Sequence, residues 1–156
     1  LKVARSLIET LRLVPVMVSF GLGVGLLLAL QYVAVHEHYG LAAAVSGLLL
    51  LVVGAIACVT AAAAKWLVIG RITVSEHPLW SSFVWRSELS DAFVETVAAP
   101  WFARAATGTE VLNVFLRGLG AHIGRGVWCE SWWLPEFDLV RLGDDVAVTA
   151  TVRRER

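Results

Sequence analysis

Residues 118–148 read GLGAHIGRGVWCESWWLPEFDLVRLGDDVAV, and this stretch decides the fold of the second half of the chain. Two six-residue copies of one pattern lie within it, residues 123–128 (IGRGVW) and residues 142–147 (LGDDVA). Each copy has an aliphatic residue, a glycine, two polar or turn-prone positions and then a valine. The copies start 19 residues apart, which is one more than three hexads. Hexapeptide repeats of this kind build β-helices, in which one aliphatic side chain per hexad points inward and glycine takes the tight corner.

The repeat predicts one shared interior for four aliphatic side chains, Ile123, Val127, Leu142 and Val146. A pair of ordinary hairpin turns in a small β-region is the alternative interpretation. Two copies are few for a β-helix, because about three repeats are usually needed to bury a core. We therefore expect further chain or a partner to cover the second copy.

The composition points to a membrane. The 156 residues carry no formal net charge, and their mean hydropathy of +0.72 is too high for an ordinary soluble domain of this size. Basic and acidic residues balance, so no nucleic-acid partner is expected. Cys58 and Cys129 lack CxxC spacing, which predicts neither a disulfide framework nor a zinc site. The first residue is Leu rather than Met, and we expect a segment of a longer protein.

Two long apolar runs precede the repeats. Residues 13–36 carry no formal charge and would form a helix about 36 Å long, enough to cross a hydrocarbon core of about 30 Å. The second run, residues 38–64, ends at Lys65 and Trp66, interpreted as a snorkelling cation and an interfacial ring. The sequence therefore predicts a transmembrane helical hairpin with antiparallel helices over residues 14–35 and 41–65.

Glycines in the first run predict close helix packing, because Gly21 and Gly25 have the small-xxx-small spacing of membrane helix contacts. The loop His36-Glu37-His38 could supply metal ligands, but no further partner has suitable spacing, and no metal site is assigned.

The charges flanking the hairpin predict its orientation. Basic residues lie before the first run and after the second, and none lies in the loop; they are Lys2, Arg5, Arg12, Lys65 and Arg71. The positive-inside rule then places both ends in the cytoplasm, with two passes through the membrane. The predicted parts are an amphipathic lead-in (1–12), the hairpin (13–70), an interfacial or linker helical segment (71–110) and an incomplete β-helix segment (111–156).

An amphipathic aromatic helix is predicted within residues 71–110. Ser75-Glu76-His77-Pro78 is typical of a helix start, and Pro100 should kink or end the helix. Apolar side chains recur at helical spacing, opposite a set of carboxylates. The apolar side chains are Leu79, Phe83, Phe93, Val97 and Trp101, and the carboxylates are Glu88, Asp91 and Glu95. Tryptophans such as Trp80 and Trp85 suit both a membrane interface and a surface against the β-helix, and the interface is favoured. Residues 111–116 (VLNVFL) fit a short helix or a first strand.

Three stretches carry a resemblance to a known family. They are GLGAHIGRGVWCE from residue 118, WLPE from residue 133 with Pro135 at a corner, and DLV-x-LGD from residue 138. These stretches resemble the membrane-associated C-terminal region of Pls/PosA-type nonribosomal peptide synthetases, of which the ε-poly-lysine synthetase is the best-known member. WSSFVWR-x-E from residue 80 and LN-x-FLR from residue 112 agree with it, as does an apolar pair of helices just upstream.

The resemblance implies a membrane α+β fold, in which the hairpin and the aromatic helix lead into a left-handed parallel β-helix similar to hexapeptide-repeat acyltransferases. It implies a carrier domain bearing phosphopantetheine and an adenylation domain using ATP, both outside this segment. The implied reaction is attack of an amine on an aminoacyl thioester, which needs a base near the amine and donors for the oxyanion. The implied location is the inner membrane of a bacterial cell, and the implied partners are the lipid bilayer and the rest of the same synthetase chain.

The family's catalytic histidine has no counterpart here. A later coil of the family carries a Thr-His-like motif, whereas residues 149–156 read TATVRRER. His122 is interpreted as an outward corner residue, Cys129 as a buried small side chain, and Asp144 and Asp145 as turn residues. We assign no catalytic residue and expect the segment alone to be inactive.

Two other function classes stay open. The first is a non-catalytic membrane module for anchoring or interaction, whose hairpin packs against helices and whose tryptophan-rich part docks a partner. The second, a two-helix transporter subunit, is weaker because neither apolar run contains a formally charged residue.

Overall fold

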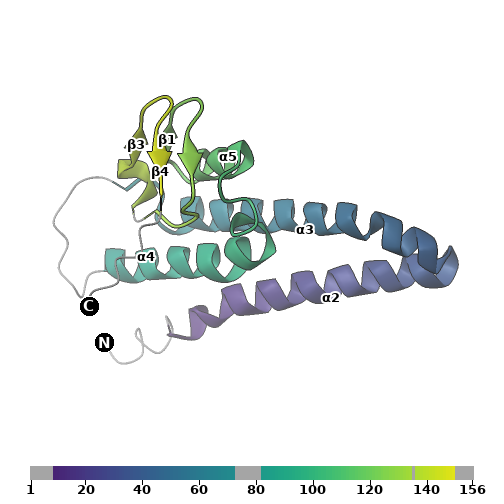
Figure 1. Cartoon of the computed structure of the whole chain (residues 1–156). Helices are drawn as coiled ribbons and strands as arrows, with labels where there is room; N and C mark the ends of the chain where they lie inside the picture. The colour runs from purple at the N-terminus through teal and green to yellow at the C-terminus, as the bar shows by residue number, and fades with distance from the viewer. Residues whose placement is uncertain (1–8, 73–81, 135, 150–156) are drawn as a thin grey trace, which may run out of the picture.

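The computed structural model describes residues 9–72, 82–134 and 136–149 (Figure 1). The helical elements are α2 (Leu13–His36), α3 (Tyr39–Val68), α4 (Ser82–Phe93), the π-helix η1 (Val94–Ala103), α5 (Glu110–Gly118) and the 3-10 helix η2 (Phe137–Leu139). The strands are β1 (His122–Ile123), β2 (Trp128–Cys129), β3 (Arg141–Leu142) and β4 (Ala147–Val148). The predicted helix start at 75–78, Leu79, Trp80, Pro135 and residues 1–8 of the lead-in lie outside the described residues.

The predicted helical hairpin is confirmed. α2 and α3 lie side by side and antiparallel, and both are long and apolar enough to cross a membrane (Figure 1). Two hydroxyls inside α3 donate to its own backbone, Ser46 Oγ to Ala43 O and Thr60 Oγ1 to Ile56 O, at 2.7 Å each. These bonds satisfy the hydroxyls without water. α3 ends at Val68, and Gly70, two residues later, has a φ of 72°, which fits the left-handed residue that commonly follows a helix.

The predicted packing role of Gly21 and Gly25 is wrong in the structure. A Cβ atom at either position would meet no described atom within 4 Å. Other glycines lie at the helix contacts: a Cβ at Gly23 would be 3.6 Å from the Trp101 ring, and one at Gly54 would be 3.2 Å from Phe102 Cβ. One glycine on each long helix therefore allows η1 to pack closely against the hairpin.

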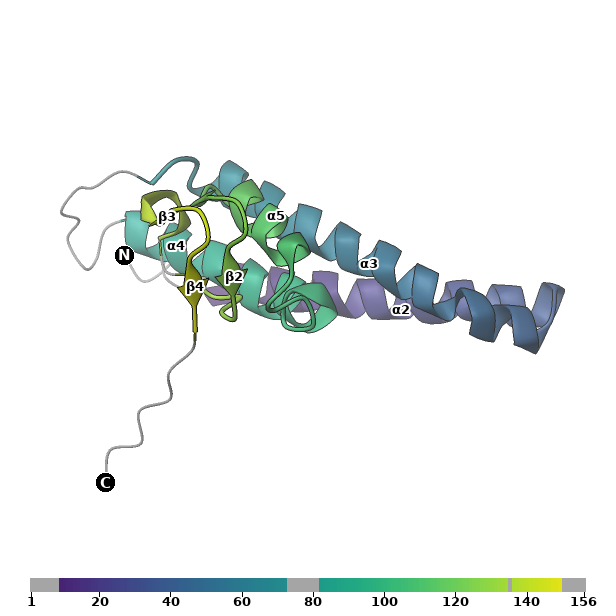
Figure 2. The same cartoon turned by 45° about the horizontal axis from the view of Figure 1, so that its top comes forward.

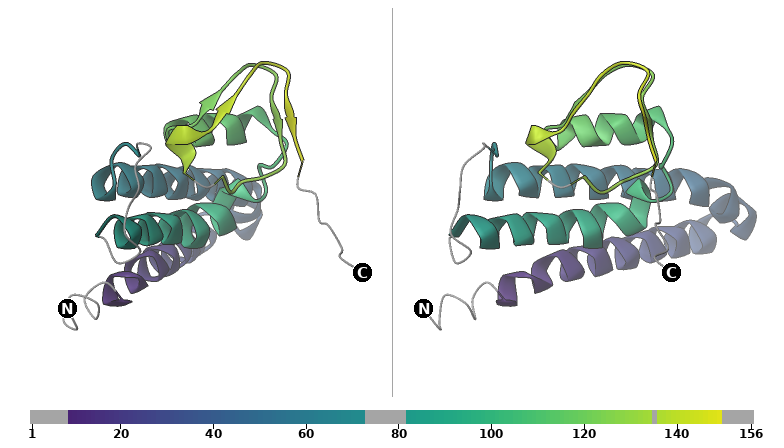
Figure 3. Two further views of the ribbon diagram at one scale, coloured as in Figure 1. Left: turned by 90° about the vertical axis from the view of Figure 1, so that its left-hand side faces the viewer. Right: turned by 60° about the vertical axis from the view of Figure 1, so that its left-hand side comes forward.

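α4 and η1 form one continuous helical segment that runs alongside α2 and α3 (Figure 3). The segment lies along the two long helices rather than across them, and its placement at a membrane interface stays a prediction. Pro100 does not end the helix, because π-helical hydrogen bonding carries the chain past it to Ala103. The wide turn directs Trp101 and Phe102 to different helices, and Trp101 Nε1 donates to Ser19 Oγ of α2 at 2.9 Å.

The two hexad copies stack as parallel strands. β1 pairs with β3 and β2 with β4, with His122 opposite Arg141 and Trp128 opposite Ala147, so the register equals the 19-residue repeat. The two loops of chain run almost on top of each other in Figure 3. Parallel pairing rules out hairpins between the copies. Each pair has only two strands and no sheet closes, so the complete β-helix stays a proposal.

The left-handed corner lies two residues later than predicted. Gly126 and Asp145, again 19 residues apart, have φ values of 67° and 57°. The preceding Gly124 is required by contact instead, because a Cβ there would be 2.6 Å from the carbonyl carbon of Gly143 and 2.7 Å from Asp144 N. The first glycine of the motif therefore sets the spacing between the coils, and the fourth position turns the chain.

Three of the four predicted interior side chains face the core. Ile123 and Val127 are buried, and Leu142 is half-buried against them. Val146 is 37% exposed, so its predicted burial is wrong. It belongs to the outer copy, which has no described layer above it. Residues 111–116, for which a short helix and a first strand were both predicted, form part of helix α5. This helix lies between the coils and α3 (Figure 2).

Candidate functional site

A buried ion pair joins the end of α3 to the coils. Lys65 Nζ lies 2.7 Å from Asp138 Oδ2, and the two side chains are 1% and 6% exposed. The backbone N–H of Ile72 also donates to Asp138 Oδ2, at 2.9 Å. The interpretation of Lys65 as a snorkelling cation is therefore wrong, because its ammonium group points into the protein.

The chain comes close to this ion pair at Gly120. Its φ of 112° is a conformation that few side-chain-bearing residues adopt. A Cβ there would collide with the Asp138 carboxylate and lie 3.2 Å from Lys65 Nζ. Trp66 adds a second link, since its Nε1 donates to Gly118 O at 2.8 Å, and the Lys65 ammonium lies 3.8 Å from the centre of its ring. The first coil is thus fixed directly on α3.

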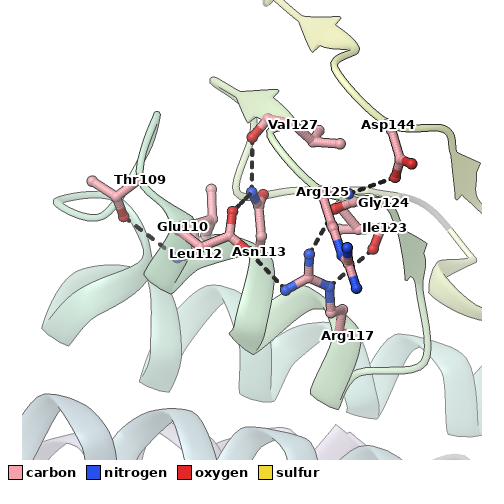
Figure 4. Close-up of polar contacts among 10 residues, drawn as sticks. All are labelled: Thr109, Glu110, Leu112, Asn113, Arg117, Ile123, Gly124, Arg125, Val127 and Asp144. Carbon is pink, nitrogen blue, oxygen red and sulfur yellow. Dashed lines mark hydrogen bonds and ion pairs between the residues drawn. The ribbon is translucent and has the colours of Figure 1, made fainter.

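Arg117 fastens α5 to the first coil (Figure 4). Its Nε donates to Ile123 O at 2.9 Å and its Nη2 to Gly124 O at 2.7 Å. Its Nη1 lies 2.8 Å from Glu110 Oε1. The hydrogen bond from Asn113 and then the one from Arg117 lower the pKa of the Glu110 carboxyl. Arg117 therefore acts as a structural clamp, and its guanidinium is already engaged.

Asn113 makes a second clamp on the same face of α5. Its Nδ2 donates to Val127 O at 2.8 Å and to Glu110 Oε2 at 2.9 Å (Figure 4). The side chain is fully buried, and its Oδ1 has no hydrogen-bond partner in the described structure. An unsatisfied buried oxygen is uncommon. The clamps from Asn113 and Arg117 add to the buried apolar side chains of α5 in holding this nine-residue helix on the coil.

A cleft of about 550 Å³ opens beside these contacts. Its walls include Trp66, Arg71 and Ile72 from the end of α3, and His122, Asp138 and Arg141 from the coils. Arg71 and Arg141 form no hydrogen bond or ion pair with any residue that the structure describes, and His122 is exposed. Lys65 already neutralises Asp138. The cleft therefore carries a net positive charge.

The structure separates the residues weighed as reactive groups. Cys129 is fully buried and its Sγ lies 3.2 Å from Ser131 O, as expected for a structural cysteine. Asp144 accepts a hydrogen bond from Arg125 N at 2.7 Å and Asp145 takes the corner, so both are turn residues as predicted. Only His122 lines the cleft.

His36 stacks on Tyr32 at the far end of the hairpin, with ring centres 4.2 Å apart. Within the described ranges, no three His, Cys, Asp or Glu side chains are arranged to hold a metal ion.

The acidic face of α4 predicts a pH effect. Burial, together with the neighbouring carboxylates Glu88 and Glu95, raises the pKa of Asp91 to about 6. Glu88 is paired with Arg12. Because the folded pKa of Asp91 exceeds its ordinary value of 3.8, the folded state binds the extra proton between pH 3.8 and 6. Proton binding by Asp91 therefore adds fully to the free energy of unfolding below pH 3.8, and this contribution is lost as the pH rises from 3.8 to 6.

We therefore expect Asp91→Asn to raise the free energy of unfolding at pH 7.5 by about 1–2 kcal/mol, after discounting for solvent screening. The difference from the parent should shrink at pH 4.5. Thermal unfolding in neutral detergent, followed by circular dichroism at both pH values, measures it. Glu136→Gln, an exposed carboxyl away from this face, is the matched control. An equal gain at both pH values would show that ionisation of Asp91 is not the cause.

The fold and the site define a helical-hairpin module that holds stacked parallel coils against the end of its second long helix. The chain is 35% identical over 145 residues to the delta-poly-L-ornithine synthetase of Acinetobacter baumannii (strain AB307-0294). The match covers 92% of this chain and 11% of that protein, so the chain spans about a tenth of its relative's length. No family model matches the chain, and no solved structure matches it. Over nearly its whole length, the chain is therefore similar to one segment of a poly-amino-acid synthetase.

Proposed function

We propose that this chain is one segment of a membrane-bound nonribosomal peptide synthetase of the Pls/PosA type. Its hairpin crosses the membrane twice with both ends in the cytoplasm, and its coils open a left-handed β-helix of the acyltransferase-like kind. The carrying observation is the identity to a poly-amino-acid synthetase over nearly the whole chain. On its own, the segment is inactive.

Helix lengths support the membrane placement. α3 has 30 residues and is about 45 Å long. η1 covers it at Gly54, so the uncovered part, residues 39–53, is only about 22 Å long. A hydrocarbon core of about 30 Å therefore reaches past Gly54 to about Val59. The Trp101 and Phe102 end of η1 then lies inside the cytoplasmic edge of the bilayer.

The outer coil supports the β-helix. The far edges of β3 and β4 have no strand beside them among the described residues, and Val146 is exposed on the same side. Unpaired strand edges are normally covered in native proteins. A further coil of the same repeat would pair with these edges and bury Val146. Such coils would also supply the catalytic histidine that the described coils lack.

The proposed chemistry is amide formation between amino acids. An adenylation domain elsewhere in the synthetase activates each amino acid with ATP, and a carrier domain holds it as a phosphopantetheine thioester. The amine of one residue attacks the thioester carbonyl, the new amide forms and the thiol leaves. A base and oxyanion donors are needed, and we place them on other coils. This chain's contribution is to fix the first coil at a set height above the membrane, through Lys65, Asp138 and Trp66.

Replacement within the complete polypeptide encoded by the gene tests this role. In one strain, residues 1–156 are deleted in frame; in a second, an unrelated two-span hairpin replaces them. We expect the deletion to abolish formation of poly-amino-acid product, detected by mass spectrometry of extracts, and the unrelated hairpin to restore membrane localisation without product. His36→Ala with His38→Ala, at the far loop, is the control that keeps product.

Recovery of product with the unrelated hairpin would favour the alternative, a non-catalytic membrane anchor. Failure of the parent strain to make any amide-linked amino-acid polymer would refute the proposal.

A further inference from the structure

An apolar groove runs between α3 and α5, next to the basic cleft. Its volume is about 400 Å³, and its walls include Cys58, Val59 and Ala62 of α3 and Val114 and Phe115 of α5. Val111 and Val114, which both line the groove, are 56% and 59% exposed, so α5 leaves an apolar patch open there. The groove therefore suits a long apolar ligand rather than a polar one.

The groove and the cleft lie one after the other along α3. Val59, Ala62 and Trp66 follow one stripe of α3, because residues three or four apart lie on the same helix face. Val59 and Ala62 line the groove, and Trp66 lines the cleft. The hydrogen bond from Trp66 Nε1 to Gly118 O marks the boundary, since Gly118 lines the groove. An elongated molecule that occupies both would have to pass over this hydrogen-bonded pair.

The basic side chains of the cleft are suited to binding a phosphate group. Arg71 and Arg141 are the cations left without a described partner, whereas Arg117 is held by Glu110 and two carbonyl groups. The carboxylate in the cleft, Asp138, is neutralised by Lys65 and by the N–H of Ile72. Arginine pairs well with phosphate oxygens. An apolar tail joined to an anionic head is the ligand that matches both ends.

The position of the groove along α3 can be compared with the thickness of a bilayer. Twenty residues of α3 from Tyr39 cover a hydrocarbon core of about 30 Å and end near Val59. Val59 and Ala62 in the groove then lie at the hydrocarbon boundary. The headgroup layer adds about 7 Å, so Trp66, about 10 Å beyond Val59, lies just past its outer edge, and Arg71 lies farther out. This step rests on the membrane placement in the proposed function.

We propose that the groove and cleft together bind one anionic phospholipid of the cytoplasmic leaflet. An acyl chain lies between α3 and α5, and the phosphate contacts Arg71 and Arg141. The lipid fills the seam that joins the hairpin to the first coil, and it thereby ties the position of the coil to the membrane surface.

Native mass spectrometry of the whole chain in neutral detergent tests the proposal. Dioleoyl phosphatidylglycerol and dioleoyl phosphatidylcholine share their acyl chains and differ in charge, so they are added at equal concentration. We expect tenfold or greater preference for phosphatidylglycerol, because each basic side chain near an anionic headgroup is worth about fivefold in affinity. Arg71→Gln with Arg141→Gln should reduce the preference to within about twofold.

Arg125→Gln is the matched control, because Arg125 lies on the same coil but does not line the cleft; it should keep the preference. Val114→Asn should weaken binding of both lipids several-fold without changing their ratio. All variants are compared by circular dichroism, and since Arg71, Val114 and Arg141 are exposed, they should fold.

Three results would overturn the proposal. Equal binding of the two lipids by the parent chain would leave the arginines without a role. An equal loss with Arg125→Gln would indicate diffuse charge attraction rather than a site. Displacement of phosphatidylglycerol by an equimolar amount of soluble phosphopantetheine would assign the cleft to a water-soluble phosphate ester. Each result leaves the synthetase test independent, because that test measures polymer and uses none of these variants.

Discussion

Asp138→Ala is expected to lower the free energy of unfolding by about 3–5 kcal/mol, the usual cost of removing one partner of a buried ion pair. Lys65 would keep its charge while only 1% exposed, and the N–H of Ile72 would lose its acceptor. Lys65→Ala should cost a similar amount, because the Asp138 carboxylate is equally enclosed. Urea or heat unfolding of the chain in neutral detergent measures both values.

A double replacement separates the charge from the packing. Lys65→Met with Asp138→Leu removes both charges and keeps similar volumes, and such replacements are often neutral or stabilising. We expect the double variant to recover most of the stability that either single variant loses. Arg125→Ala, an exposed arginine on the same coil, should change stability by no more than about 0.5 kcal/mol. If Asp138→Ala were as mild as Arg125→Ala, the ion pair would not hold the coil on α3.

The sequence predicted the elements whose signals are local. An uncharged run long enough to cross a membrane predicts a helix whatever surrounds it, and α2 and α3 followed. The 19-residue repeat likewise predicted which residues pair, because a parallel coil must place equivalent positions above one another. In both cases the local sequence pattern alone determines the structure that it predicts.

The contacts that build the site were not predicted, because each joins residues far apart in the chain. Lys65 and Asp138 are separated by 73 positions. A lysine at the end of an apolar run looks the same whether it reaches for headgroups or for a buried carboxylate. One signal could have helped: Asp138 lies in the DLV stretch that carries the family resemblance, and an acid there can neutralise a lysine near a membrane surface. Asn113 gave a similar hint as a polar residue between apolar neighbours.

The contacts of η1 could not be predicted from the sequence for a different reason. Helix periodicity assigned Trp101 and Val97 to one face, yet the π-helical turn around Pro100 changes the phase of the side chains. Small-xxx-small spacing then drew attention to Gly21 and Gly25, whereas contact falls at Gly23 and Gly54. Spacing identifies residues that permit close approach, and only the partner decides which of them is used.

Gly54→Leu is therefore the second substitution with a large expected effect. Even a Cβ at this position would be 3.2 Å from Phe102 Cβ and from Trp101 O, and neither atom can move without the backbone of η1. Overpacking of this kind costs about 1–3 kcal/mol or more. We expect the free energy of unfolding to fall by about 3 kcal/mol, near the upper end of that range, because the contact is to backbone.

Gly21→Leu supplies the control, since it adds the same side chain to the same hairpin where no described atom lies within 4 Å of the new Cβ. It should be neutral or slightly stabilising, because leucine favours a helix more than glycine does by up to about 1 kcal/mol. Adding Phe102→Ala to Gly54→Leu should return part of the lost stability, which shows that the two residues are coupled. Equal losses for Gly54→Leu and Gly21→Leu in the same detergent would mean that the hairpin packs through the glycines that the spacing first indicated. A selective loss at Gly54 would establish that η1, and with it the height of the first coil, is fixed by the hairpin.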